Sequence, residues 1–195
     1  AKVVAGAEAI GYKGLATFEF LRSKEGEFYF MEVNPRVQVE HTVTEMITGL
    51  DLVSLGIMVS AGANLPISQN QVVFSGHAIQ ARINAENPFS LEPSPGKLWE
   101  CHWPGGPGVR VDSHGFSGYD MPGAFDSLLA KVIAWAPTRE QAIARLDSAL
   151  DETILIGLDT LIPLHKAILA EKNFLERNIT IDYLTEHHES LLGGK

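Results

Sequence analysis

Five polar side chains recur at every second position of one segment, which contains Glu32, Asn34, Arg36, Gln38 and Glu40. In an extended backbone this spacing places them on one face, with apolar residues on the other. The face would hold two carboxylates, one guanidinium and two amides, and it lacks the Thr, Lys and Ser typical of a solvated strand. This composition favours a site for a metal-bound anion over the exposed face of a half-buried strand.

Two aromatic residues upstream, Phe28 and Phe30, share the same period-two register. The predicted face therefore passes from apolar to charged along one strand. A face of this kind is typical of the wall and floor of a pocket.

A preceding strand-like segment adds a further carboxylate, Glu19. Glu19, Glu32 and Asn34 offer only oxygen ligands, which select Mg²⁺ or Mn²⁺. The alternative is an exposed cross-strand acidic pair, which like-charge repulsion makes unfavourable without a cation. The residues alone leave both interpretations open.

A permanent cation and a carboxylate follow in the same row. Arg36 suits an oxyanion because its planar fork can engage a carboxylate bidentately. Glu40 can then act as a general base toward a bound acid, although a salt bridge between these two residues is the alternative. Arg82 lies in an otherwise apolar segment and is either paired with Glu86 or directed into the same site.

The composition excludes several classes of protein. The 195 residues carry a net charge of -9 without a basic cluster, so nucleic acid is not an expected partner. Cys101 is the single cysteine, which excludes an internal disulfide and a Cys-rich zinc site. The sequence shows no membrane-spanning run and no signal peptide, so we expect a cytoplasmic protein. The start at Ala1, in a segment that reads as the middle of a helix, suggests a piece of a longer chain.

A hairpin is expected to position the candidate site. Residues 15–21 and 27–34 read as strands, and the polar turn 23–26 between them brings Glu19 and Glu32 onto one face. Further strands are predicted at 72–74, 76–84, 96–102, 109–113 and 127–135, and helices at 3–10, 52–61, 139–153, 161–170 and 181–192, with a short helix capped by Thr42 or Thr44 and ended by Gly49. The pattern predicts an α+β fold with a small antiparallel sheet packed by helices.

A polar, Pro-containing stretch at residues 63–71 marks the expected domain boundary. It gives one domain over residues 1–66 and a second over residues 67–195. The segment Gly105–Gly108 reads as a turn rather than a phosphate-binding loop. The scattered side chains of His41, His77, His102 and His114 lack metal-site spacing, and we expect them to be structural.

Several longer motifs run through most of the chain in order. They are Phe30–His41 with Thr44–Glu45, Thr17–Phe20, Gly76–Ala78, Arg82–Glu86, Pro93–Gly96, Gly105–Arg110 and Phe125–Ser127. Together they closely resemble the biotin carboxylases of biotin-dependent carboxylases. The resemblance implies the end of an ATP-grasp domain followed by a biotin carboxylase C-terminal domain.

The resemblance also implies roles for individual residues. Glu19, Glu32 and Asn34 match ligands of the divalent metals, Mg²⁺ or Mn²⁺, that accompany ATP. Arg36 matches the arginine that stabilises the biotin enolate, and Gln38 and Val39, with Arg36, match the bicarbonate site. Glu40 matches the base that deprotonates bicarbonate. Arg82 matches an arginine near the biotin ureido oxygen and bicarbonate.

The implied reaction is ATP-dependent carboxylation of biotin, held on a carrier protein, through carboxyphosphate. Expected partners are ATP, bicarbonate, a biotinyl carrier domain and a carboxyltransferase component. Residues that match Pro107 and Arg110 lie near the family's homodimer interface, where the position of Pro107 can be aromatic. The family's phosphate-binding flap and lysines should precede Ala1, so we expect this chain alone to be inactive. The parent enzyme, whether an acetyl-, propionyl-, methylcrotonyl-CoA, pyruvate or urea carboxylase, stays open.

Two other functions are considered. One is a different ATP-grasp ligase, such as half of a carbamoyl-phosphate synthetase, although Gln38–His41 and Arg82–Glu86 argue against it. The other is a non-catalytic dimerisation or docking module, which the joint presence of Glu32, Arg36 and Glu40 disfavours.

Overall fold

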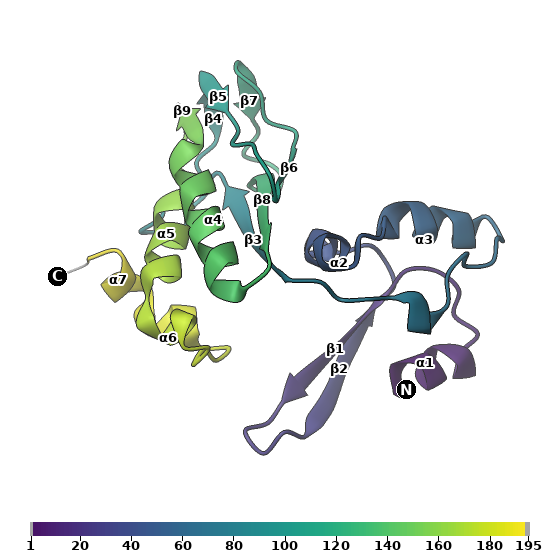
Figure 1. Cartoon of the computed structure of the whole chain (residues 1–195). Coiled ribbons are helices and arrows are strands. Elements are labelled where there is room, and N and C mark those ends of the chain that lie inside the picture. The colour runs from purple at the N-terminus through teal and green to yellow at the C-terminus, as the bar shows by residue number, and fades with distance from the viewer. Residues whose placement is uncertain (1, 194–195) are drawn as a thin grey trace. The chain divides into compact units, whose positions relative to one another are not determined.

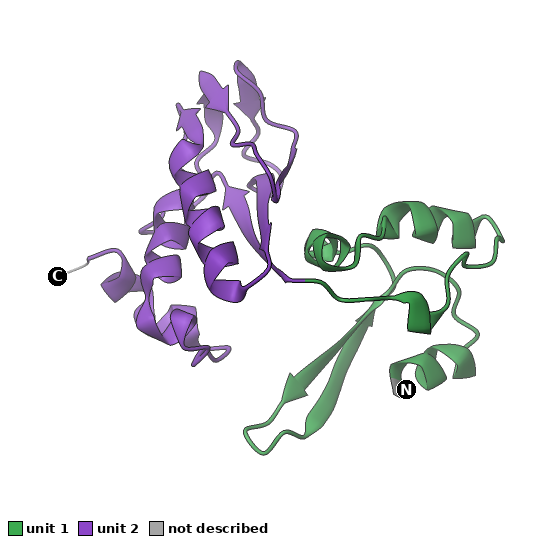
Figure 2. Cartoon of the chain, in the orientation of Figure 1, with its two compact units in different colours: residues 1–75 green, residues 76–195 purple. Residues whose placement is uncertain are grey.

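The computed structural model describes residues 2–193 and shows the predicted α+β fold (Figure 1). The chain forms two compact units, Ala1–Ser75 and Gly76–Lys195 (Figure 2). The domain boundary expected between residues 66 and 67 stays a prediction. It precedes the short 3-10 helix η1, which belongs to the first unit.

The first unit is built from short helices around one two-stranded hairpin. Its elements are α1 (Lys2–Ala9), β1 (Thr17–Arg22), β2 (Phe28–Asn34), α2 (His41–Thr48), α3 (Leu52–Ser60) and η1 (Gln69–Gln71). Gly49 ends α2 in the left-handed region at φ 71°, where glycine has no side-chain penalty. Asp51 caps α3 by accepting a hydrogen bond from the Ser54 amide at 2.7 Å. The predicted threonine cap of α2 is wrong, because Glu40 occupies the N-cap position.

The hairpin has the predicted pairing near the site but not at its tip. Glu19 lies directly opposite Glu32, and the register shifts between Glu19 and Phe20, which pairs with Phe30. Met31 is therefore an extra residue on β2, a β-bulge that reverses the alternation of faces beyond it. Phe28 and Phe30 share the face of Phe20, whose ring makes edge contacts with both. The predicted single face running from these aromatics to Glu32 is wrong.

The second unit contains a three-stranded antiparallel sheet with the strand order β3-β8-β6. Its elements are β3 (His77–Asn84), β4 (Gly96–Leu98), β5 (Glu100–His102), β6 (Val109–Ser113), β7 (Tyr119–Met121), β8 (Leu128–Ala136), α4 (Arg139–Glu152), β9 (Ile154–Ile156), α5 (Ile162–Ala170), α6 (Lys172–Leu175) and α7 (Tyr183–Leu191). The single strand predicted at 96–102 is two strands, which pair separately with β7 and β9. Residues 72–74 form no strand.

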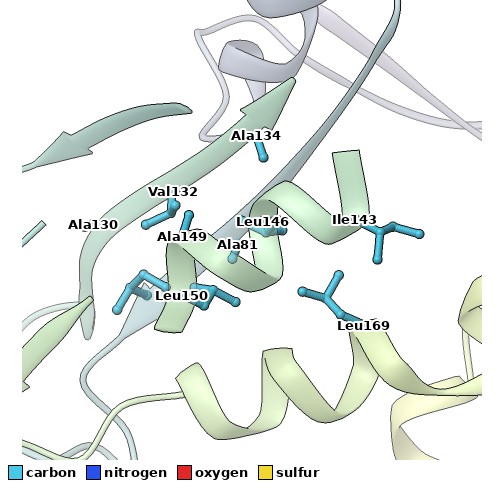
Figure 3. Close-up of a cluster of buried hydrophobic side chains, with 10 residues drawn as sticks. Ala81, Ala130, Val132, Ala134, Ile143, Leu146, Ala149, Leu150 and Leu169 are labelled. Carbon is cyan, nitrogen blue, oxygen red and sulfur yellow. The ribbon is translucent and has the colours of Figure 1, made fainter. Parts of the chain in front are cut away.

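Small residues on one face of the sheet let α4 pack closely against it. Ala81, Ala130, Val132 and Ala134 lie in one buried cluster with Leu146 of α4 (Figure 3). Figure 3 also shows Ile143, Ala149 and Leu150 of α4, and Leu169 of α5, in the same cluster. Thr138 caps α4 by accepting a hydrogen bond from the Gln141 amide at 3.3 Å. The predicted small sheet packed by helices is thus present.

No single helix among residues 2–193 meets the length and apolarity needed to cross a membrane. Only α2 and α3 taken as one pair, bent by 105°, satisfy the length and composition criteria.

Candidate functional site

Two amide side chains, one from strand β2 and one from the following loop, converge on the carboxylate of Glu19 in β1. Glu19 Oε1 accepts a hydrogen bond from Asn34 Nδ2 at 2.8 Å and another from Gln38 Nε2 at 2.9 Å. Asn34 Nδ2 also donates to Glu32 Oε1 at 3.0 Å. The two acidic side chains that face each other across the hairpin therefore meet at a single amide nitrogen, which offsets their repulsion.

The chain leaves the strand immediately after this amide. Pro35 has no backbone N–H, and the Arg36 amide donates to the Asn34 carbonyl at 2.9 Å, which turns the backbone. The Arg36 guanidinium donates to Asn34 Oδ1 at 3.3 Å and to the Val37 carbonyl at 3.2 Å. The extended row predicted from Glu32 to Glu40 is therefore wrong beyond Asn34, and Arg36 joins the cluster through a turn.

Residues 38–40, the last part of the predicted row, form the turn that precedes α2. The Gln38 carbonyl accepts a hydrogen bond from the His41 amide at 3.2 Å and lies 2.6 Å from His41 Nδ1. Val39 and Glu40 form the turn, and Glu40 is the N-cap residue of α2. The side chain of Glu40 is exposed, while that of Val39 is half-buried. The helix fixes where Glu40 projects.

Helix α2 is attached to the next helix by a buried acid, Glu45, which the sequence pattern did not identify as a site residue. Glu45 is 8% exposed, and its Oε1 accepts the Leu52 amide at 2.7 Å, which joins α2 to the first turn of α3. Its Oε2 lies 3.9 Å from His41 Nε2. The spacing of four residues between His41 and Glu45 on one helix face was the available signal.

Arg82 belongs to the second unit and lies on β3 with an exposed side chain. Its neighbours Ala81 and Ile83 point into the core, with 1% and 0% exposure, so the alternation of the strand turns the guanidinium to the opposite face. Glu86, the local partner that the sequence offers for Arg82, accepts hydrogen bonds from Asn84 Nδ2 and from Ser127 Oγ.

The donor set around Glu19 fits a hard divalent cation. Glu19 and Glu32 direct carboxylate oxygens to one point, where Asn34 Nδ2 donates to both, while the amide oxygen of Asn34, its possible metal ligand, accepts from Arg36. Mg²⁺ is commonly held by one or two carboxylates together with substrate phosphates and water, so two acids suffice. Within residues 2–193 there is no group of three or more His, Cys, Asp and Glu side chains arranged to hold a metal.

Comparisons with known proteins agree with this fold. The model of the biotin carboxylase C-terminal domain matches residues 80–186. The model of the ATP-binding domain of the carbamoyl-phosphate synthase L chain matches residues 1–68. The Haemophilus influenzae biotin carboxylase is 51% identical over 175 residues, which are 90% of this chain and 39% of that protein. The chloroplastic biotin carboxylase of Arabidopsis thaliana is 48% identical over 189 residues, covering 96% and 35%.

Solved structures match equally well. The biotin carboxylase domain of 2-oxoglutarate carboxylase from Hydrogenobacter thermophilus, a dimer in complex with MgADP, ADP and bicarbonate, has a TM-score of 0.93 and 43% identity. The match covers 97% of this chain and 42% of that one. The Campylobacter jejuni biotin carboxylase has a TM-score of 0.92 and 40% identity, covering 95% and 41%. The chain spans about two fifths of the length of these relatives, and it belongs to the biotin carboxylase family.

Proposed function

We propose that the cluster around Glu19 and Asn34 is the metal- and bicarbonate-binding part of a biotin carboxylase active site. The observation that carries the proposal is the meeting of Glu19, Glu32 and Gln38 at one place, with Arg36 bonded to the same asparagine. The Arg36 guanidinium lies beside the carboxylates of Glu19 and Glu32, and this arrangement suits a reaction between two anions, bicarbonate and the phosphate of ATP. The whole reaction is ATP-dependent carboxylation of biotin through carboxyphosphate.

In this proposal each side chain has one task. Glu19, Glu32 and Asn34 hold Mg²⁺ or Mn²⁺, which neutralises phosphate charge when bound. Gln38 and Val39, with Arg36, orient bicarbonate, and Glu40 removes its proton.

The two arginines act on biotin. Arg36 stabilises the negative charge that develops on the ureido oxygen of biotin, because a pre-positioned guanidinium needs no reorganisation during the reaction. Arg82 contacts the same oxygen and bicarbonate. The exposed guanidinium of Arg82 supports this role, since a buried one would be out of reach of a carrier-bound substrate.

The partners follow from the reaction. ATP, bicarbonate and a biotinyl carrier domain are the proposed substrates, and a carboxyltransferase component is the proposed acceptor of the product. We also propose a homodimer that uses the surface near Pro107 and Arg110. Arg110 makes a bidentate ion pair with Asp112 at 2.8 and 3.0 Å, which orients its guanidinium on β6.

The experiment measures two separate properties of the 195-residue chain. In the first, transfer of isotopic bicarbonate to free biotin with ATP and Mg²⁺ should show no turnover; turnover would contradict the expectation that this chain alone is inactive. In the second, bicarbonate titration in Mg²⁺ should shift the NMR signals of Gln38 and Arg36, and Arg36→Ala should abolish the shift of the Gln38 signal. Lys24→Ala, in the exposed hairpin turn, is the matched control. Retention of the shifts in Arg36→Ala would contradict the proposed site.

A further inference from the structure

Arg82 lies at a weak point of its sheet. Within residues 2–193, strand β3 lies at the edge of its sheet and pairs with β8. The register between them shifts between Ile83 and Asn84, one residue after Arg82, so an extra residue on β8 interrupts the ladder there. The bulge bends β8 and disrupts the ladder just beyond the Arg82–Lys131 pair, so contacts on the other edge of β3 add support to the strand there.

Helix α5 supplies those contacts along the other edge of β3. The Arg82 carbonyl lies 2.7 Å from His165 Nε2, and because a carbonyl can only accept, the imidazole nitrogen donates. One turn earlier, the Leu161 amide donates to the Asn84 carbonyl at 3.2 Å. The carbonyls of Arg82 and Asn84 both point away from β8, and they accept hydrogen bonds from His165 and Leu161, which are four residues apart. The start of α5 therefore bonds this edge of β3 as a neighbouring strand would.

The side chain of Arg82 shares its sheet face with fixed charges. Lys131 lies directly opposite on β8, and its Nζ is 3.2 Å from Asp112 Oδ2 on β6. Arg110 holds the other side of the same carboxylate. The two neighbouring cations are held by ion pairs with Asp112, and the backbone position of Arg82 sets the point from which its guanidinium extends over the same face.

We propose that His165 is a positioning residue, which holds the Arg82 backbone so that the guanidinium presents to an anionic substrate. The inference rests on the proposed role of Arg82 in binding bicarbonate and biotin. The donated hydrogen bond is the operative feature. Gln at position 165 can replace it with an amide N–H, whereas Leu cannot.

The test compares His165→Leu and His165→Gln in the full 195-residue chain. The readout is ¹⁵N relaxation at the Arg82 backbone amide and side-chain Nε, together with the shift of the Nε signal on titration with bicarbonate. The matched control is His188→Leu, because His188 Nε2 makes the same type of bond to the Pro88 carbonyl at 2.8 Å. Thermal unfolding of each variant reports the general loss of stability separately.

We expect His165→Leu to lower the order parameter of Arg82 from the rigid value of about 0.85 toward the flexible range below about 0.6. It should also weaken the bicarbonate response severalfold, while His165→Gln restores both and His188→Leu changes neither. An Arg82 that stays rigid in His165→Leu, or equal losses in the Leu and Gln variants, would overturn the positioning role. A rigid Arg82 in the unmodified chain that gives no bicarbonate response would instead contradict the proposed function.

Discussion

The side-chain amide of Asn34 connects three residues of the candidate site. Asn34 Nδ2 donates to the carboxylates of Glu19 and Glu32, and the same side chain accepts from Arg36 through Oδ1. The amide hydrogens lie between the two acidic side chains, which offsets their repulsion across the hairpin. A divalent cation placed at the same point would offset the repulsion more strongly, since it carries two full charges.

Replacing this amide with a third carboxylate tests that balance. Asn34→Asp should destabilise the hairpin by about 1–2 kcal/mol without metal, because the amide N–H that donates to both carboxylates is lost and like charges meet. Amide hydrogen exchange in β1 and β2 should then accelerate about 5- to 30-fold, and Mg²⁺ should reverse the change. Asn178→Asp, which alters an exposed amide bonded to Glu176, is the control. Exchange rates that ignore Mg²⁺ would argue against a cation site.

A second residue-scale prediction concerns pH. Burial lowers the pKa of His165 from its ordinary value of 6.5, although its bond to the Arg82 carbonyl partly opposes the shift. The unfolded chain therefore binds a proton at His165 more readily than the folded chain does. The contribution of His165 to the free energy of unfolding should be fully present above pH 6.5 and should decrease as the pH falls toward the folded pKa. His165→Gln should reduce this loss in thermal unfolding scans, whereas exposed His102→Gln should not. An unchanged slope in His165→Gln would contradict the assignment.

At the scale of elements, the short helix α6 depends on side chains at both ends. Glu171 Oε2 accepts the Phe174 amide at 3.1 Å and the Tyr183 hydroxyl at 3.0 Å, which caps α6 and attaches α7. Arg139 of α4 donates to the carbonyls of Phe174 and Leu175 at 2.6 and 2.9 Å. A helix of four residues cannot form alone, so these contacts from neighbouring elements stabilise it.

The link between α6 and α7 can be followed through the phenol. Burial, and then the hydrogen bond and charge of Glu171, raise the pKa of Tyr183 to about 12. Glu171→Gln removes the charge, and the pKa of Tyr183 should fall toward its ordinary value of 10.0. Tyrosinate absorbance as a function of pH measures the pKa of Tyr183, and Tyr183→Phe identifies its signal among those of the four tyrosines. Glu176→Gln is the control. A pKa that does not move would show that burial alone raises it.

The same elements show what local sequence can and cannot predict. The pairing of Glu19 with Glu32 and the Asp51 and Thr138 caps were predictable, because each depends on a few neighbouring residues. Strands β7 and β9 have three residues each and obtain their pairing from distant segments, so no periodicity marks them.

For the candidate site around Glu19, the sequence predicts which residue types occur but not how their side chains are arranged. The bulge at Met31 and the turn at Pro35 each break the period of two on which the predicted row depended. Gln38 contacts Glu19 only because of that turn. The bond from His165 to Arg82 joins residues 83 positions apart, and it depends on how α5 packs against β3.

For the whole molecule, the apolar core is unevenly divided. Every apolar side chain found buried among the described residues, from Ala81 to Tyr183, belongs to the second unit. In the described part of the first unit only Thr42 and Glu45 are buried, while Phe28 and Phe30 are 68% and 59% exposed.

This division predicts different behaviour for the two units when they are made separately. Residues 76–195 should unfold cooperatively, because sheet β3-β8-β6 and α4 enclose a core, and Leu146→Ala should cost about 2–5 kcal/mol by opening a cavity there. Residues 2–75 should show helical circular dichroism without a sigmoidal melt, since they bury too little apolar surface to offset chain entropy. Calorimetry of both fragments measures this, with Leu184→Ala, at a 43% exposed position, as the control for Leu146→Ala. A cooperative transition in residues 2–75 would mean that the hairpin and its helices are stable without a closed core, and that the candidate metal site is preformed independently of any partner.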